Sequence, residues 1–297
     1  MKKKFIVVTG GAGFVGSNLI DYLINKTKYK IISIDNYSTG RKINQNLSKR
    51  VKYIKGDTND IHKLLKKFKF DINVIFHFGE YARIHQSFND VNKCFLSNIS
   101  GTSKVFSFCL ENNIKVVYSA TSASLGNNGL DQSLSPYAFT KSKNLHLLMH
   151  LNNWYDFKYE ALYFYNVYGK RQIETGEMAT VIGIFENQYK NGLPLSVVLP
   201  GNQTRRFTHI SDTIKVCFTA WKNKKCAHYS ITHRKSYSID AVAKMFKSKI
   251  KYLPPRLGER YASALTNMSY NNKVIKKYGK ISLKDYLTSF IKDQKIK

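Results

Sequence analysis

The feature that most constrains this fold is a glycine-rich segment at residues 9–16 (TGGAGFVG). It follows an apolar run at residues 5–8, which predicts a strand buried on both faces, and it precedes leucines and isoleucines at helical spacing. Its three glycines, spaced three residues apart, permit a tight turn, admit a pyrophosphate to backbone N–H groups and let the helix pack on the strand. A glycine-rich turn without a ligand is the alternative, but the flanking strand and helix favour a dinucleotide-binding loop.

A second apolar run, residues 31–34, ends at Asp35, about twenty residues after the glycines. An acid at this place accepts a hydrogen bond from an adenosine ribose hydroxyl and repels a 2′-phosphate, which predicts NAD rather than NADP. Arg41 lies nearby and leaves NADP as an alternative. A third strand is predicted at residues 51–57, where Asp57 either meets the adenine or caps a turn.

Further strands are predicted at residues 74–79 and 115–121, with helical segments between them. This alternation predicts an α/β fold with a doubly wound parallel sheet of the Rossmann type, whose ligands bind beyond the carboxyl ends of the strands. Gly79 and Thr121 fall on that edge, together with the start of the helix that carries Tyr137.

Tyr137 and Lys141 stand four residues apart in residues 135–141 (SPYAFTK), so they share one face of the predicted helix. A nearby ammonium favours the phenolate form of tyrosine. The pair can therefore take a proton from an alcohol, provided that a hydride acceptor lies beside it.

Beyond about residue 165 the regular alternation of strands and helices is lost. We predict a dinucleotide-binding Rossmann domain over residues 1–165. Residues 166–297 form mainly a smaller α/β substrate-binding part, with some segments returning to the first domain.

The chain has 48 Lys and Arg against 19 Asp and Glu, a formal charge of +29. The lysines are spread over the whole length, which favours a solvated basic surface that attracts polyanionic small molecules over a nucleic-acid site. A nucleic-acid-binding protein built on a dehydrogenase-like fold is the non-enzyme alternative. The cysteines show no metal-ligand spacing and no apolar run reaches membrane-spanning length, so we expect a cytoplasmic protein without a metal or a membrane partner.

Taken together, the motifs resemble the extended short-chain dehydrogenase/reductase family, specifically its nucleotide-sugar epimerases and dehydratases. The resemblance covers nearly the whole chain. The matching segments are residues 9–16, 35–40, 76–78, 98–102, 135–141, 165–169, 171–172, 203–207 and 255–259.

The resemblance implies NAD that stays bound and a nucleoside-diphosphate sugar, with UDP as the favoured nucleotide. By analogy Tyr137 is the base, Lys141 holds the nicotinamide ribose and lowers the pKa of the tyrosine, and Thr121 hydrogen-bonds the reacting oxygen. The expected cofactor-binding residues are Gly10, Gly13, Phe14, Val15, Gly16, Asp35, Asn36, Asp57, Thr58, Phe78, Gly79, Asn98, Ser119, Tyr137 and Lys141. The expected substrate-binding residues are Glu80, Thr121, Asn166, Arg205 and Arg256, and the planar arginine forks suit phosphate oxygens.

The residues after Thr121 decide between the reactions of the family. Its 4,6-dehydratases have an Asp-Glu pair there and its decarboxylases a glutamate, whereas this chain has Ser122 and Ala123. Eliminating water needs a proton donor and an acceptor in place. We therefore expect NAD-dependent 4-epimerisation of a UDP-hexose, or of its N-acetyl or uronate form, in the synthesis of polysaccharide precursors. An NAD(P)H-dependent 4-ketosugar reductase is the alternative, against which Asp35 speaks.

Two expectations concern departures and assembly. Glu80 stands where the family has a small residue, and a salt bridge with Arg83 is the favoured interpretation. The alternative is that Glu80 contacts sugar hydroxyls or shuttles a proton.

Apolar residues at 105–108 and 145–148 resemble the family's four-helix interface, which implies a homodimer, although core packing explains them equally well.

Overall fold

The computed structural model describes residues 4–124, 131–257 and 274–296. Its centre is an eight-stranded parallel sheet in the order β14-β11-β6-β5-β4-β1-β2-β3, which confirms the predicted doubly wound α/β fold. The strands are β1 (Phe5–Thr9), β2 (Lys30–Asp35), β3 (Val51–Lys55), β4 (Ile72–His77), β5 (Lys115–Thr121), β6 (Tyr159–Phe164), β11 (His228–Thr232) and β14 (Val274–Tyr278).

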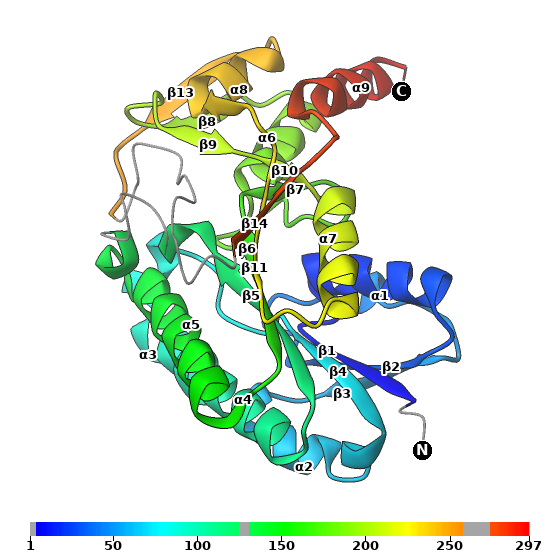
Figure 1. Ribbon diagram of the computed structural model, residues 1–297. Coiled ribbons are helices and arrows are strands. Elements are labelled where there is room, and N and C mark those ends of the chain that lie inside the picture. The colour runs from blue at the N-terminus through cyan, green and yellow to red at the C-terminus, as the bar shows by residue number, and fades with distance from the viewer. Residues whose placement is uncertain (1–3, 125–130, 258–273, 297) are drawn as a thin grey trace.

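Helices cover both faces of this sheet (Figure 1). One face carries α1 (Phe14–Lys26) and α7 (Ile210–Lys222). The other carries α2 (Ile61–Leu65), α4 (Thr102–Glu111) and α5 (Pro136–Tyr155), with α3 (Val91–Phe95) leading through a π-helical turn, Leu96–Gly101, into α4. Successive residues of a strand point to opposite faces, so Ile6 and Val8 pack toward α1 and α7 whereas Val7 packs toward α4 and α5. That is why the first strand is apolar at all four residues from 5 to 8.

A smaller part lies beyond the carboxyl edge of the sheet (Figure 1). Its elements are β7 (Val167–Tyr168), α6 (Val181–Lys190), β8 (Leu195–Val198), β9 (Thr204–Arg206), β10 (Thr208–His209), β12 (Ser236–Ser238), α8 (Ile239–Met245), β13 (Ile250–Leu253) and α9 (Leu283–Lys295). Phe185, Leu195, Val242, Phe246 and Leu287 are among the residues of its own buried core. The strands β11 and β14 belong to the central sheet, although they come late in the chain.

The start of α5 places the two residues that the sequence singled out. Ser135 caps this helix by accepting a hydrogen bond from Ala138 N at 3.1 Å, and Pro136 occupies the first helical position. Tyr137 and Lys141 therefore fall in the first two turns, on the side that faces the carboxyl ends of the strands.

Most of the apolar residues that resemble a dimer interface pack in the core, and Leu147 is partly buried against it. Those from α4 and α5 that pack in the core are Val105, Phe106, Phe108, Leu145 and Leu148. In the described ranges, no helix has the length and apolar character needed to cross a membrane.

Candidate active site

A cavity of about 1490 Å³ lies at the carboxyl edge of the sheet and is lined by residues of both the sheet and the smaller part. Every residue that the sequence predicts for the site, with the exception of Asn98, lines this cavity. The fold thus brings the glycine-rich loop, the Tyr137 helix and the two arginines of the smaller part to one place.

The glycine-rich loop is shaped for close approach. Gly10 has a φ of +68°, and a Cβ there would stand 2.9 Å from the backbone of Phe78 and Gly79. The helix α1 begins directly after its N-cap residue Gly13, which has no side chain to cap the helix, and its first turn holds no acid. The N–H groups at this helix end are therefore available to an anion, which fits the pyrophosphate of a dinucleotide.

Two aspartates, Asp35 and Asp57, line the cavity beyond the glycine-rich loop. The Asp35 carboxylate accepts hydrogen bonds from Ala12 N at 2.9 Å and Tyr37 N at 2.8 Å, and burial raises its pKa. The Asp57 carboxylate accepts from Asn59 N at 3.0 Å, so it caps a turn while it also lines the cavity. Both interpretations offered for Asp57 are thus compatible with its position.

The phenol of Tyr137 is hydrogen-bonded to Thr121, the last residue of β5. Burial raises the pKa of Tyr137 to about 12, the bond with Thr121 lowers it, the charge of Glu80 raises it and that of Arg83 lowers it. We expected Lys141 to be the cation that lowers this pKa. Instead the ammonium of Lys141 is paired with Glu80, and Arg83 has the lowering effect.

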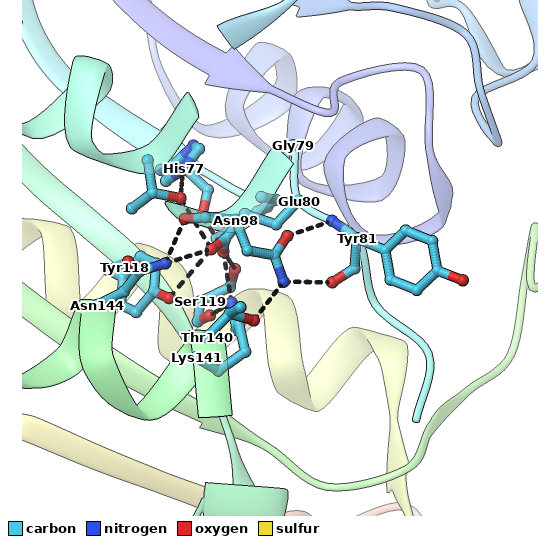
Figure 2. Close-up of polar contacts among 12 residues, drawn as sticks. His77, Gly79, Glu80, Tyr81, Asn98, Tyr118, Ser119, Thr140, Lys141 and Asn144 are labelled. Carbon is cyan, nitrogen blue, oxygen red and sulfur yellow. Dashed lines mark hydrogen bonds and ion pairs between the residues drawn. The ribbon is translucent and has the colours of Figure 1, made fainter. Parts of the chain in front are cut away.

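Glu80 and Lys141 form an ion pair inside the protein (Figure 2). The exposed fractions of their side chains are 2% and 4%. Lys141 also donates to the carbonyl of Ser119, and its Nζ lies 4.5 Å from the centre of the Tyr118 ring. The other donors to the Glu80 carboxylate are Thr102 Oγ1 at 2.9 Å, Tyr118 OH at 3.1 Å, Asn144 Nδ2 at 3.2 Å and Ser119 Oγ at 3.4 Å.

The favoured expectation of a Glu80–Arg83 salt bridge is therefore wrong. Arg83 Nε donates to the carbonyl of Met178 at 2.8 Å, and Nη1 donates to that of Ala82 at 2.8 Å. The reason is local, because residues three apart meet only on a helix and the chain leaves β4 here without forming one. Direct contact of Glu80 with a sugar is also disfavoured, since its side chain is only 2% exposed and its carboxylate already accepts hydrogen bonds from protein groups.

Asn98 lies behind the cavity wall. Its Oδ1 accepts from Tyr81 N at 2.7 Å, and its Nδ2 donates to Tyr81 O at 3.0 Å and to Thr140 Oγ1 at 3.1 Å (Figure 2). The structure therefore does not bring this amide to the cofactor side as expected. It fixes the loop after β4 instead.

The smaller part contributes the predicted nucleotide side. Asn166, with a φ of +34°, donates to Arg206 O at 2.9 Å, and Arg205 lies on β9. Arg256 follows β13, and all three predicted residues line the cavity. Residues 258–259 of the matched segment lie outside the described residues.

Three comparisons with known proteins agree with this geometry. The model of the NAD dependent epimerase/dehydratase family matches residues 6–232. A putative UDP-glucose 4-epimerase of Methanocaldococcus jannaschii is 31% identical, over 86% of this chain and 88% of the relative.

Two solved structures are similar over nearly the whole chain. The UDP-N-acetylglucosamine 4-epimerase of Methanobrevibacter ruminantium, in complex with UDP-N-acetylmuramic acid, is 30% identical with a TM-score of 0.85, covering 98% of both chains. The UDP-glucuronic acid 4-epimerase of Bacillus cereus, with UDP-glucuronic acid and NAD, is 25% identical with a TM-score of 0.83, covering 98% of this chain and 99% of that one.

Proposed function

Because this chain belongs to the NAD-dependent epimerase/dehydratase family, we propose that it epimerises C4 of a UDP-sugar through a transient 4-keto sugar, with NAD that stays bound. The observation that carries the proposal is the hydrogen bond between Thr121 and Tyr137 in the cavity that also holds the glycine-rich loop. Similar proteins named as 4-epimerases support the same reaction.

NAD supplies the hydride acceptor and donor when it is bound. Tyr137, as the phenolate, takes the proton of the C4 hydroxyl while Thr121 hydrogen-bonds the reacting oxygen. After the keto sugar turns over, Tyr137 returns the proton to the same oxygen. The oxygen regains its proton and C4 would regain its hydride on the opposite face, so each cycle leaves the sugar without net oxidation.

The other roles follow from the cavity wall. The N-terminus of α1, after Gly13, holds the pyrophosphate of the cofactor, Asp35 holds its adenosine ribose and Lys141 its nicotinamide ribose. Arg205 and Arg256 hold the diphosphate of the sugar nucleotide, because their guanidinium groups meet phosphate oxygens bidentately.

Dehydration is disfavoured by the residues around Thr121. Ser122 and Ala123 follow it, and both are buried. The Glu80 carboxylate is engaged by Lys141 and cannot serve as the acid of an elimination while it stays ionised.

The test is a panel of UDP-glucose, UDP-N-acetylglucosamine and UDP-glucuronate, followed by proton NMR with and without added NAD. We expect one sugar to convert to its 4-epimer without net NADH, and we expect Tyr137→Phe to abolish the conversion. Tyr159→Phe is the matched control, because it removes a buried hydroxyl that bonds His228 away from the cavity. No conversion of any sugar by NAD-loaded protein would overturn the proposal, and NADPH-dependent reduction of a 4-keto sugar would establish the reductase instead.

A further inference from the structure

Glu80 is a buried carboxylate to which the reaction above assigns no step. Burying a carboxylate and an ammonium is costly unless both are paired and hydrogen-bonded. Here the pair lies at the edge of the cavity, between the end of β4 and the second turn of α5 (Figure 2). Because Glu80 is buried beside Lys141, a residue of the proposed reaction, it can affect that reaction through Lys141.

A chain of hydrogen bonds leads through His77 to the Glu80 carboxylate. Two backbone N–H groups after β4 donate to Thr9 Oγ1 at 3.1 Å, and this oxygen lies 2.8 Å from His77 Nδ1. His77 Nε2 lies 2.9 Å from Thr102 Oγ1, which lies 2.9 Å from the Glu80 carboxylate. Burial lowers the pKa of His77 to about 4, so the ring is neutral at pH 7. When the ring proton is on Nε2, Thr9 Oγ1 donates to Nδ1, Nε2 donates to Thr102 Oγ1, and Thr102 Oγ1 donates to the Glu80 carboxylate. The carboxylate at the end of the chain is then an acceptor, as an ionised carboxylate is.

We propose that Glu80 is a positioning residue for Lys141, which its carboxylate holds in place, charged, at the cofactor side of the cavity. The inference rests on the role of Lys141 in the proposed function. An ammonium has three N–H donors. Glu80 and the carbonyl of Ser119 take two of them in the described structure, which leaves one for the ribose of the cofactor.

The geometry disfavours the two roles that the sequence suggested for Glu80. Thr102, Tyr118 and Asn144 donate to its Oε1. Lys141 donates to its Oε2, and Ser119 Oγ lies 3.4 Å from the same oxygen. A carboxylate has about four lone-pair sites. These sites are thus occupied by the protein itself. A sugar hydroxyl or a travelling proton would have to displace one of these donors.

The consequence is a dependence on pH. Burial lowers the pKa of Lys141, whereas Glu80 raises it. The other groups that face the ammonium are His77, Cys94 and the Tyr118 ring, and none of them is a carboxylate. Without the charge of Glu80 the Lys141 pKa falls further, so Lys141 loses its proton at a lower pH than in the wild type.

The experiment measures NAD binding by calorimetry at pH 7 and pH 9 in four proteins: wild type, Glu80→Gln, Lys141→Met and the double variant. We expect Glu80→Gln to bind NAD about tenfold more weakly at pH 7, the loss of about one hydrogen bond to a charged group, and still more weakly at pH 9. Lys141→Met should be weak at both values, and the double variant should bind no more weakly than Lys141→Met. If Glu80→Gln weakened NAD binding equally in the wild-type and the Lys141→Met backgrounds, the proposal would be overturned.

Two variants separate positioning from a general loss of structure. Glu160→Gln is the matched control, because Glu160 forms a buried pair with Lys115 at 2.9 Å outside the cavity, and we expect it to keep the wild-type affinity at both pH values. Glu80→Asp keeps the charge, and its NAD affinity should respond to pH as that of the wild type does. If Glu80→Asp loses affinity with pH as Glu80→Gln does, the carboxylate charge is not what holds Lys141. No sugar is needed, so failure of the 4-epimerase proposal would leave this test intact.

Discussion

The hydroxyl of Tyr137 is hydrogen-bonded to that of Thr121, and the same phenol is buried beside the guanidinium of Arg83. Burial raises the pKa of Tyr137 to about 12, so the phenol keeps its proton at pH 7. In the proposed reaction, proton transfer from the sugar starts from the phenolate. The groups that lower this pKa should therefore control the rate.

The first prediction concerns pH. Below the pKa of Tyr137 the phenolate fraction rises about tenfold for each pH unit, so kcat/KM should rise with pH between about 6 and 9. Arg83→Gln removes a charge that lowers this pKa, so its profile should be displaced to higher pH. The exposed Arg234, changed to Gln, is the control and should leave the profile unmoved. Superimposable profiles for wild type and Arg83→Gln would contradict the prediction.

The second prediction concerns Thr121. Thr121→Val removes a hydrogen bond that lowers the Tyr137 pKa, so kcat should fall by about 10- to 100-fold, with the rise of the pH profile displaced to higher pH. Thr121→Ser keeps the hydroxyl and should remain near the wild-type rate. Initial rates by proton NMR measure both. A serine variant as slow as the valine variant would show that the methyl group, and not the hydroxyl, is what matters.

The third prediction concerns the choice of cofactor. Asp35→Asn removes the negative charge that repels a 2′-phosphate, so the ratio of NAD to NADP affinity should fall by at least about tenfold. Asp57→Asn alters the other aspartate of this wall and should change the ratio little. Calorimetric titration of both cofactors gives the ratio. An unchanged ratio in Asp35→Asn would mean that another group rejects the phosphate.

The fourth prediction concerns stability. The pKa of His77 falls from 6.5 to about 4 on folding, because burial disfavours the charged form of its ring. The unfolded chain therefore binds the extra proton between these values, and stability is complete above pH 6.5 and declines as the pH falls toward 4. The shift corresponds to about 3 kcal/mol. Urea unfolding at pH 7 and pH 4.5 should show a larger loss in wild type than in His77→Gln, and equal losses would contradict the assigned neutral ring.

Local patterns were enough to predict most of the fold. The run at residues 5–8 became β1, the glycines became the loop before α1, and the Ser-Pro pair marked the start of α5. These features depend on neighbours within a few residues. Asn144 follows Tyr137 by seven residues and so lies two turns along the same face of α5, so helical spacing alone could have pointed to it.

Contacts between distant segments were not predictable in this way. Glu80, Thr102 and Tyr118 meet only because β4, α4 and β5 are neighbours in the folded sheet and its covering layer. The pairing of Glu80 with Arg83 failed because it assumed a helix that does not form. Asn98 was assigned from its motif, and the motif does not tell which way the amide points.

The interleaving of the two parts limits how such a protein can be re-engineered. The elements of the smaller part come from three stretches of the chain, separated by α7 with β11 and by β14, which belong to the sheet. A fragment that ends after β6 would leave the edge of that strand without its partner β11 and expose the apolar face that α7 covers. New sugar specificity therefore cannot be transplanted as a C-terminal cassette; a chimera must replace separate loops while it retains these late strands.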